Sequence, residues 1–266
     1  MSRIEKVFTK PAHKALIPYV MVGYPDTRAT LDIVPAFESA GADIVELGIP
    51  FSDPLADGAT IQKASFNALK KGVTPRMCID IAAKLSARVK IPLAFMSYAN
   101  PVFNYGLKEF CHDSASAGIS GLIIPDLPPE EATELEAAAR ICGLDLIYFL
   151  APTSSEARIR FVAERASGFI YLVSVAGVTG ARNTLSPDLS RFIARVKKAT
   201  AKPVCVGFGI STAEQARRVA QIADGVIVGS RIIQLMEDKN NFISSVGNFV
   251  KGLRRALDES SVKKAR

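Results

Sequence analysis

The sequence of 266 residues is poor in the side chains that build metal centres and disulfide frameworks. It has only two histidines, His13 and His112, and its four cysteines lie far apart with no C-x-x-C pair (Cys78, Cys111, Cys142 and Cys205). These spacings match neither a zinc site nor a disulfide framework. We therefore expect no metal, and a reduced, cytoplasmic setting.

Long apolar runs are also missing. No stretch approaches the ~18 residues that a membrane-spanning helix needs. The first residues, MSRIEKVFTKPAH, lack the apolar segment of a signal peptide. The sequence therefore predicts neither a membrane span nor a secretory signal.

Clusters of positive charge are few, although the chain is basic. With 33 lysines and arginines against 26 acidic residues, its formal net charge is +7. Short basic pairs are spread along the chain, and basic residues thicken mainly in the tail after Lys251. This distribution favours a solvated surface over a nucleic-acid interface, while a positive field suits a small anionic substrate.

What the sequence does contain is a regular alternation of two patterns. Eight short, almost continuously apolar runs, typical of parallel strands covered on both faces, alternate with amphipathic stretches of helical character. The expected strands are 15–22, 43–49, 91–98, 121–124, 144–150, 169–175, 203–208 and 225–228, and the expected helices include 28–40, 129–142, 155–166, 186–199 and 212–223.

This alternation runs without a linker. It predicts a (β/α)8 TIM barrel as a single domain over residues 1–266, with a doubly wound sheet as the competitor. Residues 60–90, broken at 72–75, suggest two helices. Ile4, Val7 and Phe8 at helical spacing predict a short extra N-terminal helix that plugs the bottom of the barrel.

The second expected strand carries a carboxylate in an apolar run. Buried without a partner, Glu46 is costly, so it must be neutral, functional, or satisfied by backbone donors or an arginine. The following loop adds Asp53, which suits a turn before Pro54, and Asp57. Asp57 could cap the next helix or face Glu46 across the barrel mouth, where two carboxylates in different environments can divide acid and base roles.

Glycines follow the late strands. Strand seven ends in Val-Gly-Phe-Gly at 206–209, strand eight is followed by Gly229 and Ser230, and strand six runs into the glycines of 176–180. Backbone N–H groups can approach an anion closely at such positions, and a short helix beginning near Ser230 would add its own donors. The pattern predicts a phosphate site, with simple tight turns as the alternative.

Taken together, these segments resemble the α subunit of tryptophan synthase over nearly the full length. The resemblance rests on the signature VELGIPFSDPLADG at 45–58. Further matching segments in the same order along the chain support it (18–25, 97–106, 125–131, 174–181 and 207–211). It implies a retro-aldol cleavage of indole-3-glycerol phosphate to indole and glyceraldehyde 3-phosphate, with no metal or organic cofactor in this chain.

The resemblance also assigns roles to residues. Glu46 corresponds to the acid–base glutamate, and Asp57 to the aspartate that holds the indole N–H group and stabilises positive charge on the ring. Thr179 lies in the loop that closes over substrate. The remaining substrate-binding residues fall into an indole pocket and a phosphate set: Tyr19, Ile61, Met96, Tyr171, Phe208 and Ile227, and Gly180, Gly209, Gly229 and Ser230.

The same resemblance implies a partner, the pyridoxal-phosphate β subunit, in an α2β2 complex that channels indole. The loops around Pro54, 100–104 and 128–130 resemble the family's contact surface. Two features depart from the family: Val175 stands where some members carry arginine, and the chain is basic where the family is often acidic.

Three other functions are the alternatives, the first being another phosphate-binding barrel, such as an isomerase or synthase of the same biosynthetic route. Indole-glycerol-phosphate synthase would need a catalytic lysine at a strand end, and none is obvious. A non-catalytic regulator of a β partner would not need both Glu46 and Asp57. A stand-alone lyase that releases free indole is the remaining variant.

Overall fold

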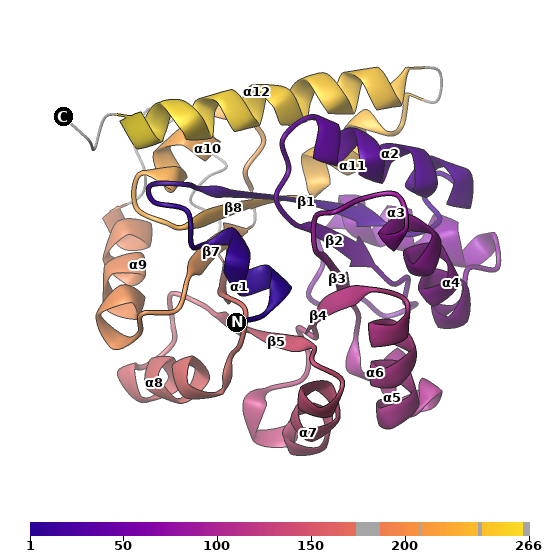
Figure 1. Cartoon of the computed structure of the whole chain (residues 1–266), viewed down its shortest axis with the longest axis horizontal. Coiled ribbons are helices and arrows are strands. Elements are labelled where there is room, and N and C mark those ends of the chain that lie inside the picture. The colour runs from indigo at the N-terminus through magenta and orange to yellow at the C-terminus, as the bar shows by residue number, and fades with distance from the viewer. Residues whose placement is uncertain (174–186, 208, 239–240, 263–266) are drawn as a thin grey trace.

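Eight parallel strands close into a barrel in chain order (Figure 1). The computed structural model describes residues 1–173, 187–207, 209–238 and 241–262. Because β8 pairs with β1, the barrel prediction is confirmed and the doubly wound alternative is wrong. The strands are β1 (Ala15–Met21), β2 (Val45–Gly48), β3 (Leu93–Met96), β4 (Ile119–Ile123), β5 (Asp145–Leu150), β6 (Ile170–Val173), β7 (Val204–Gly207) and β8 (Gly225–Val228).

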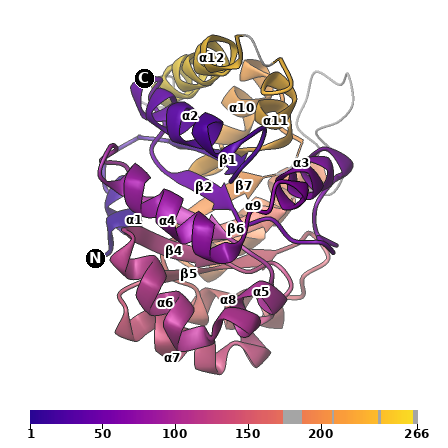
Figure 2. The ribbon, with the colours of Figure 1, turned by 90° about the vertical axis from the view of Figure 1, so that its right-hand side faces the viewer.

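Helices surround the strands on the outside, as Figures 1 and 2 show. The predicted helix 129–142 is wrong in one respect, because the chain forms two elements there, separated by Ala132. The helical elements are α1 (Arg3–Val7), α2 (Thr27–Ser39), α3 (Ala59–Lys70), α4 (Pro75–Ser86), α5 (Ala99–Tyr105), α6 (Leu107–Ser116), η1 (Pro129–Glu131), α7 (Thr133–Ile141), α8 (Glu156–Arg165), α9 (Pro187–Ala199), α10 (Ala213–Ala220), α11 (Ser230–Leu235) and α12 (Phe242–Val262).

The sequence explains both kinds of element. All seven residues of β1 are buried, since one face meets the barrel interior and the other meets helices, and this double burial selects apolar strands. Helix α2 buries Ala29, Ile33 and Phe37, which share one face at a spacing of four residues. Its first turn is capped by Asp26, whose carboxylate accepts a hydrogen bond from the Ala29 N–H group at 2.8 Å.

The predicted N-terminal helix covers the end of the barrel where the strands begin (Figure 1). Ile4 of α1 is completely buried, and Phe8 packs against Phe169 with ring centroids 6.1 Å apart. The hydroxyl of Ser2 donates to Asp145 at the start of β5. The bottom of the barrel is therefore closed, as predicted, and the carboxyl ends of the strands are left for a site.

No helix within the described ranges is both long enough and apolar enough to cross a membrane.

Candidate active site

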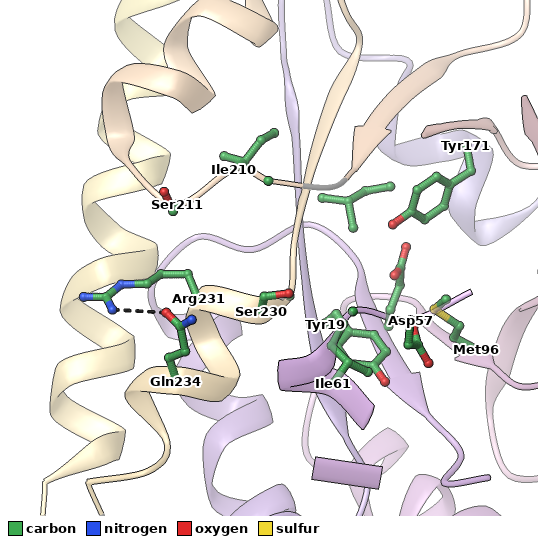
Figure 3. Close-up of a pocket in the computed structure, with 15 residues that line it drawn as sticks. Tyr19, Asp57, Ile61, Met96, Tyr171, Ile210, Ser211, Ser230, Arg231 and Gln234 are labelled. Carbon is green, nitrogen blue, oxygen red and sulfur yellow. Dashed lines mark hydrogen bonds between the residues drawn. The ribbon is translucent and has the colours of Figure 1, made fainter. Parts of the chain in front are cut away.

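A cavity of about 280 Å³ lies at the carboxyl ends of the strands (Figure 3). This volume is near the lower end of the ~300–1,000 Å³ typical of small-molecule sites. The lining residues come from β1, β2, β3, β6 and β8 and from the segments that follow β2, β7 and β8: Tyr19, Glu46, Asp57, Gly58, Ile61, Met96, Tyr171, Gly209, Ile210, Ser211, Ile227, Gly229, Ser230, Arg231 and Gln234.

Glu46 lines this cavity from β2. The strand register places it beside Tyr19 on β1 and Ala94 on β3, and its side chain is only 1% exposed. Neither carboxyl oxygen has a hydrogen-bond partner within the described part of the chain. The sequence left open that backbone donors or an arginine satisfy the Glu46 carboxylate. Among the described residues, neither does. Burial raises the pKa of Glu46 to about 8, because the charged form loses its hydration.

Asp57 reaches the cavity from the loop after β2. The Tyr98 hydroxyl donates to Asp57 Oδ2 at 3.1 Å and accepts a hydrogen bond from the Ala56 N–H group at 3.0 Å. The ring of Tyr98 stacks on Phe51, with centroids 5.3 Å apart. Helix α3 begins after Gly58 with no side-chain cap, so the helix-cap interpretation of Asp57 is wrong.

The two carboxyl groups sit in different environments. Burial raises the pKa of Asp57 to about 6, and the hydrogen bond from Tyr98 opposes that rise. Glu46 lacks any such donor among the described residues. Between pH 6 and 8, the site therefore holds Glu46 mainly as the neutral acid and Asp57 mainly as the anion.

Two tyrosines complete this end of the cavity, and two glycines make room for them. A side chain at Gly48 would collide with the hydroxyl of Tyr19, and one at Gly207 would collide with the hydroxyl of Tyr171. Burial raises the pKa of both phenols well above the usual value, so both stay neutral. The absence of a side chain at these two glycines therefore leaves room for the tyrosine hydroxyls at this end of the cavity.

The remaining lining divides into an apolar wall and a polar end. Ile61, Met96 and Ile227 supply the apolar surface that lines the cavity together with the tyrosines. Figure 3 shows Ser211 and Ser230 on the opposite side from Asp57 and Tyr171. Gly209, with a φ of 81°, and Gly229 belong to this polar end. The cavity can therefore take a ligand with an aromatic body and a polar tail.

Known proteins are similar to this chain in both sequence and fold. The family model described as "Tryptophan synthase alpha chain" matches residues 6–259. A tryptophan synthase alpha chain of Dehalococcoides mccartyi is 55% identical, covering 97% of this chain and 100% of its own length. The alpha subunit structure from Legionella pneumophila is 35% identical with a TM-score of 0.90, covering 97% and 99% of the two chains. A chain of the aminoacrylate-bound tryptophan synthase from M. tuberculosis is 35% identical with a TM-score of 0.88, covering 97% and 100%.

The chain belongs to the tryptophan synthase alpha chain family.

The family's expected site residues largely converge in this cavity. It is lined by both carboxylates and by most of the pocket and phosphate residues named from the sequence (Glu46, Asp57, Tyr19, Ile61, Met96, Tyr171, Gly209, Ile227, Gly229 and Ser230). Thr179, Gly180 and Phe208 lie outside the described residues, as does Val175. The roles of these side chains remain predictions.

Some residues at this site of the tryptophan synthase alpha chain were not assigned a role from the sequence. Ser211, Arg231 and Gln234 line the cavity, and Tyr98 holds Asp57 without lining it. Tyr98 ends the predicted strand 91–98, so its position at a strand end was an available signal. Arg231 directly follows Gly229 and Ser230, which was a signal for the polar end.

The described residues lack two features that other functions would need, a lysine in the cavity and a cluster of metal ligands. No lysine is among the described residues that line the cavity, whereas indole-glycerol-phosphate synthase would need a catalytic lysine. No group of three or more histidine, cysteine or acidic side chains in the described ranges could hold a metal ion.

Proposed function

We propose that this chain is the α subunit of tryptophan synthase and cleaves indole-3-glycerol phosphate to indole and glyceraldehyde 3-phosphate in tryptophan biosynthesis. The observation that supports it best is the buried, uncompensated Glu46 in one cavity with the half-buried Asp57. The lyase activity follows from family membership, and the role of each side chain is our proposal.

Glu46 would move the protons. With a pKa of about 8, roughly nine in ten Glu46 side chains are neutral at pH 7. The neutral acid gives its proton to C3 of the indole ring, which leaves positive charge at the ring nitrogen. The resulting carboxylate then takes the proton of the hydroxyl on the adjacent side-chain carbon. As that O–H bond breaks, the C=O bond of the aldehyde forms and the carbon–carbon bond to C3 breaks. Its electron pair returns to the ring, which restores indole.

Asp57 would stabilise the charge that this sequence creates. Its carboxylate accepts a hydrogen bond from the indole N–H group, and the positive ring intermediate strengthens that bond. Tyr98 acts as a positioning residue, since its hydroxyl fixes Asp57 Oδ2 and its ring is held by Phe51. Removing Tyr98 would leave Asp57 present but free to turn away.

The polar end of the cavity would hold the phosphate. Gly209 and Gly229 permit close approach of backbone donors, and Ser230 adds a hydroxyl. Gly180, in the segment after β6, completes the set by resemblance. Tyr19, Tyr171, Ile61, Met96 and Ile227 would enclose the indole ring, as apolar and aromatic walls suit a planar aromatic ligand.

The product would pass to a β subunit in an α2β2 complex, and the pyridoxal phosphate would belong to that partner rather than to this chain. Two exposed apolar side chains support a contact surface near the site: Leu55 is 92% exposed and Phe103 is 50% exposed. Leu55 lies in the loop around Pro54 that the resemblance assigns to the interface. Phe103 lies in segment 100–104, which the resemblance gives as a loop but which is part of helix α5. Figure 2 shows α3, which follows the loop of Leu55, and α5, which contains Phe103, along the same edge of the barrel. The four free cysteines suit a cytoplasmic enzyme.

An indole-release assay tests this proposal. The chain is given indole-3-glycerol phosphate with and without a cognate β subunit, and we expect strong stimulation by the partner. Glu46→Gln should abolish release while glycerol 3-phosphate still binds. High activity without the partner would instead identify a stand-alone lyase. Near-normal turnover by Glu46→Gln would refute the acid–base role.

A further inference from the structure

One cationic side chain reaches the cavity. Among the described residues that line it, Arg231 alone carries a permanent positive charge, whereas Glu46 and Asp57 are acidic. Arg231 directly follows Ser230 in the first turn of α11. Figure 3 places Ser211, Ser230 and Arg231 together, away from Asp57 and Tyr171. The Arg231 guanidinium lies beside Gln234, on the side of Ser230 that faces away from the carboxylates.

The guanidinium of Arg231 has no anionic partner within the described part of the chain. Its Nη1 donates to the neutral Gln234 side-chain oxygen at 3.4 Å, a long and weak hydrogen bond. Arg217 and Arg218 on nearby α10 differ, because both form ion pairs with Glu214, at 2.8 Å and 2.7 Å. The described residues thus leave the charge of Arg231 uncompensated, and its exposed side chain can turn at little cost.

A phosphate monoester would supply the missing anion. Such a group carries about −1.5 to −2 charges at pH 7, and it must share the cavity with the Asp57 carboxylate. Backbone donors and the Ser230 hydroxyl can hydrogen-bond the phosphate but bring no full positive charge. Arginine presents a planar fork of N–H donors that matches two phosphate oxygens at once.

We propose that Arg231 turns from Gln234 onto the phosphate of the bound substrate and sets the preference of this site for phosphorylated ligands. The inference rests on the proposed function, since it assigns one residue to the phosphate end of that cavity. Arg231 is a binding residue in this scheme and takes no part in proton transfer at Glu46. Its loss should therefore affect KM far more than kcat.

Binding measurements test Arg231 directly. Glycerol 3-phosphate and indole are titrated calorimetrically into the wild-type chain, Arg231→Ala, Arg231→Lys and the control Arg218→Ala, which removes the same charge outside the cavity. Arg231→Ala should weaken glycerol 3-phosphate binding about tenfold or more, with indole binding unchanged. Arg231→Lys should fall between, and Arg218→Ala should match the wild type. In the indole-release assay, Arg231→Ala should raise KM to a similar extent with kcat within about twofold.

Three results would overturn the inference: unchanged glycerol 3-phosphate affinity in Arg231→Ala, equal weakening of indole, or equal weakening in Arg218→Ala. The second would mean a general loss of pocket shape, and the third a general loss of positive field. If the wild type releases no indole, the proposed function fails, while the glycerol 3-phosphate titrations still decide the role of Arg231.

Discussion

The burial of Glu46 predicts a pH-dependent decrease in the free energy of unfolding, which a glutamine at position 46 would not cause. Its pKa is raised from 4.5 to about 8 by desolvation, and a shift of that size corresponds to about 5 kcal/mol. Between these two values the unfolded chain has released the proton and the native state still holds it. The native state thus binds more protons, so stability falls as pH rises through this window and levels off above it.

Glu46→Gln keeps the shape of the side chain and removes its titration. The free energy of unfolding of the variant, relative to the wild type, should therefore rise by about 4 kcal/mol from pH 5 to pH 9. Urea unfolding of both chains, followed by far-UV circular dichroism at several pH values, measures this difference. Glu134→Gln, on an exposed position of α7, is the matched control and should show no such trend. A pH-independent difference for Glu46→Gln would mean that the native carboxylate is solvated or paired, which would refute its role as a neutral acid.

Three further predictions concern the reaction and its ligands. The kcat/KM for indole release should be bell-shaped in pH, lost below about 6 as Asp57 gains a proton and above about 8 as Glu46 loses one; a flat profile would contradict both roles. Tyr98→Phe removes a donor that lowers the pKa of Asp57, so the acid limb should move to higher pH and kcat should fall; an unmoved limb would show that Tyr98 does not hold Asp57. Gly229→Asp should weaken glycerol 3-phosphate binding about tenfold or more, measured calorimetrically, because it adds negative charge and a Cβ 3.3 Å from the Tyr19 ring; unchanged affinity would place the phosphate elsewhere.

The barrel could be predicted because its causes are local. Each strand is covered on both faces, so apolar runs recur between amphipathic helices, and the alternation alone indicates parallel strands. Helix ends have local causes as well: Gly41 and Gly118 directly follow the C-caps of α2 and α6 with φ values of 95° and 85°, a backbone conformation that favours glycine. The split between η1 and α7 was not readable, since Ala132 between them is itself a good helix former.

The conformation of Asp57 shows where local reasoning ends. By sequence it precedes a glycine and a helix, which is also the pattern of a helix cap. The structure decides against the cap through Tyr98, 41 positions away on the chain, which bonds both Asp57 and the neighbouring Ala56 N–H group. No periodicity or propensity encodes that contact, because it depends on two strand ends meeting at one edge of the barrel. Gly48 and Gly207 are similar, since only the barrel brings them against the hydroxyls of Tyr19 and Tyr171.

The roles proposed for the two carboxylates match the places where each is anchored. Glu46 lies within a strand, so the barrel buries it beside Tyr19 and Ala94, and burial raises its pKa. Asp57 lies in the loop beyond the strand end, where water and a hydrogen bond from Tyr98 can stabilise its charge. Exchanging the two positions would exchange the protonation states, because environment and not residue type determines them. A proton donor that must be neutral thus belongs on the strand, and an anion that must stabilise a cation belongs on the loop.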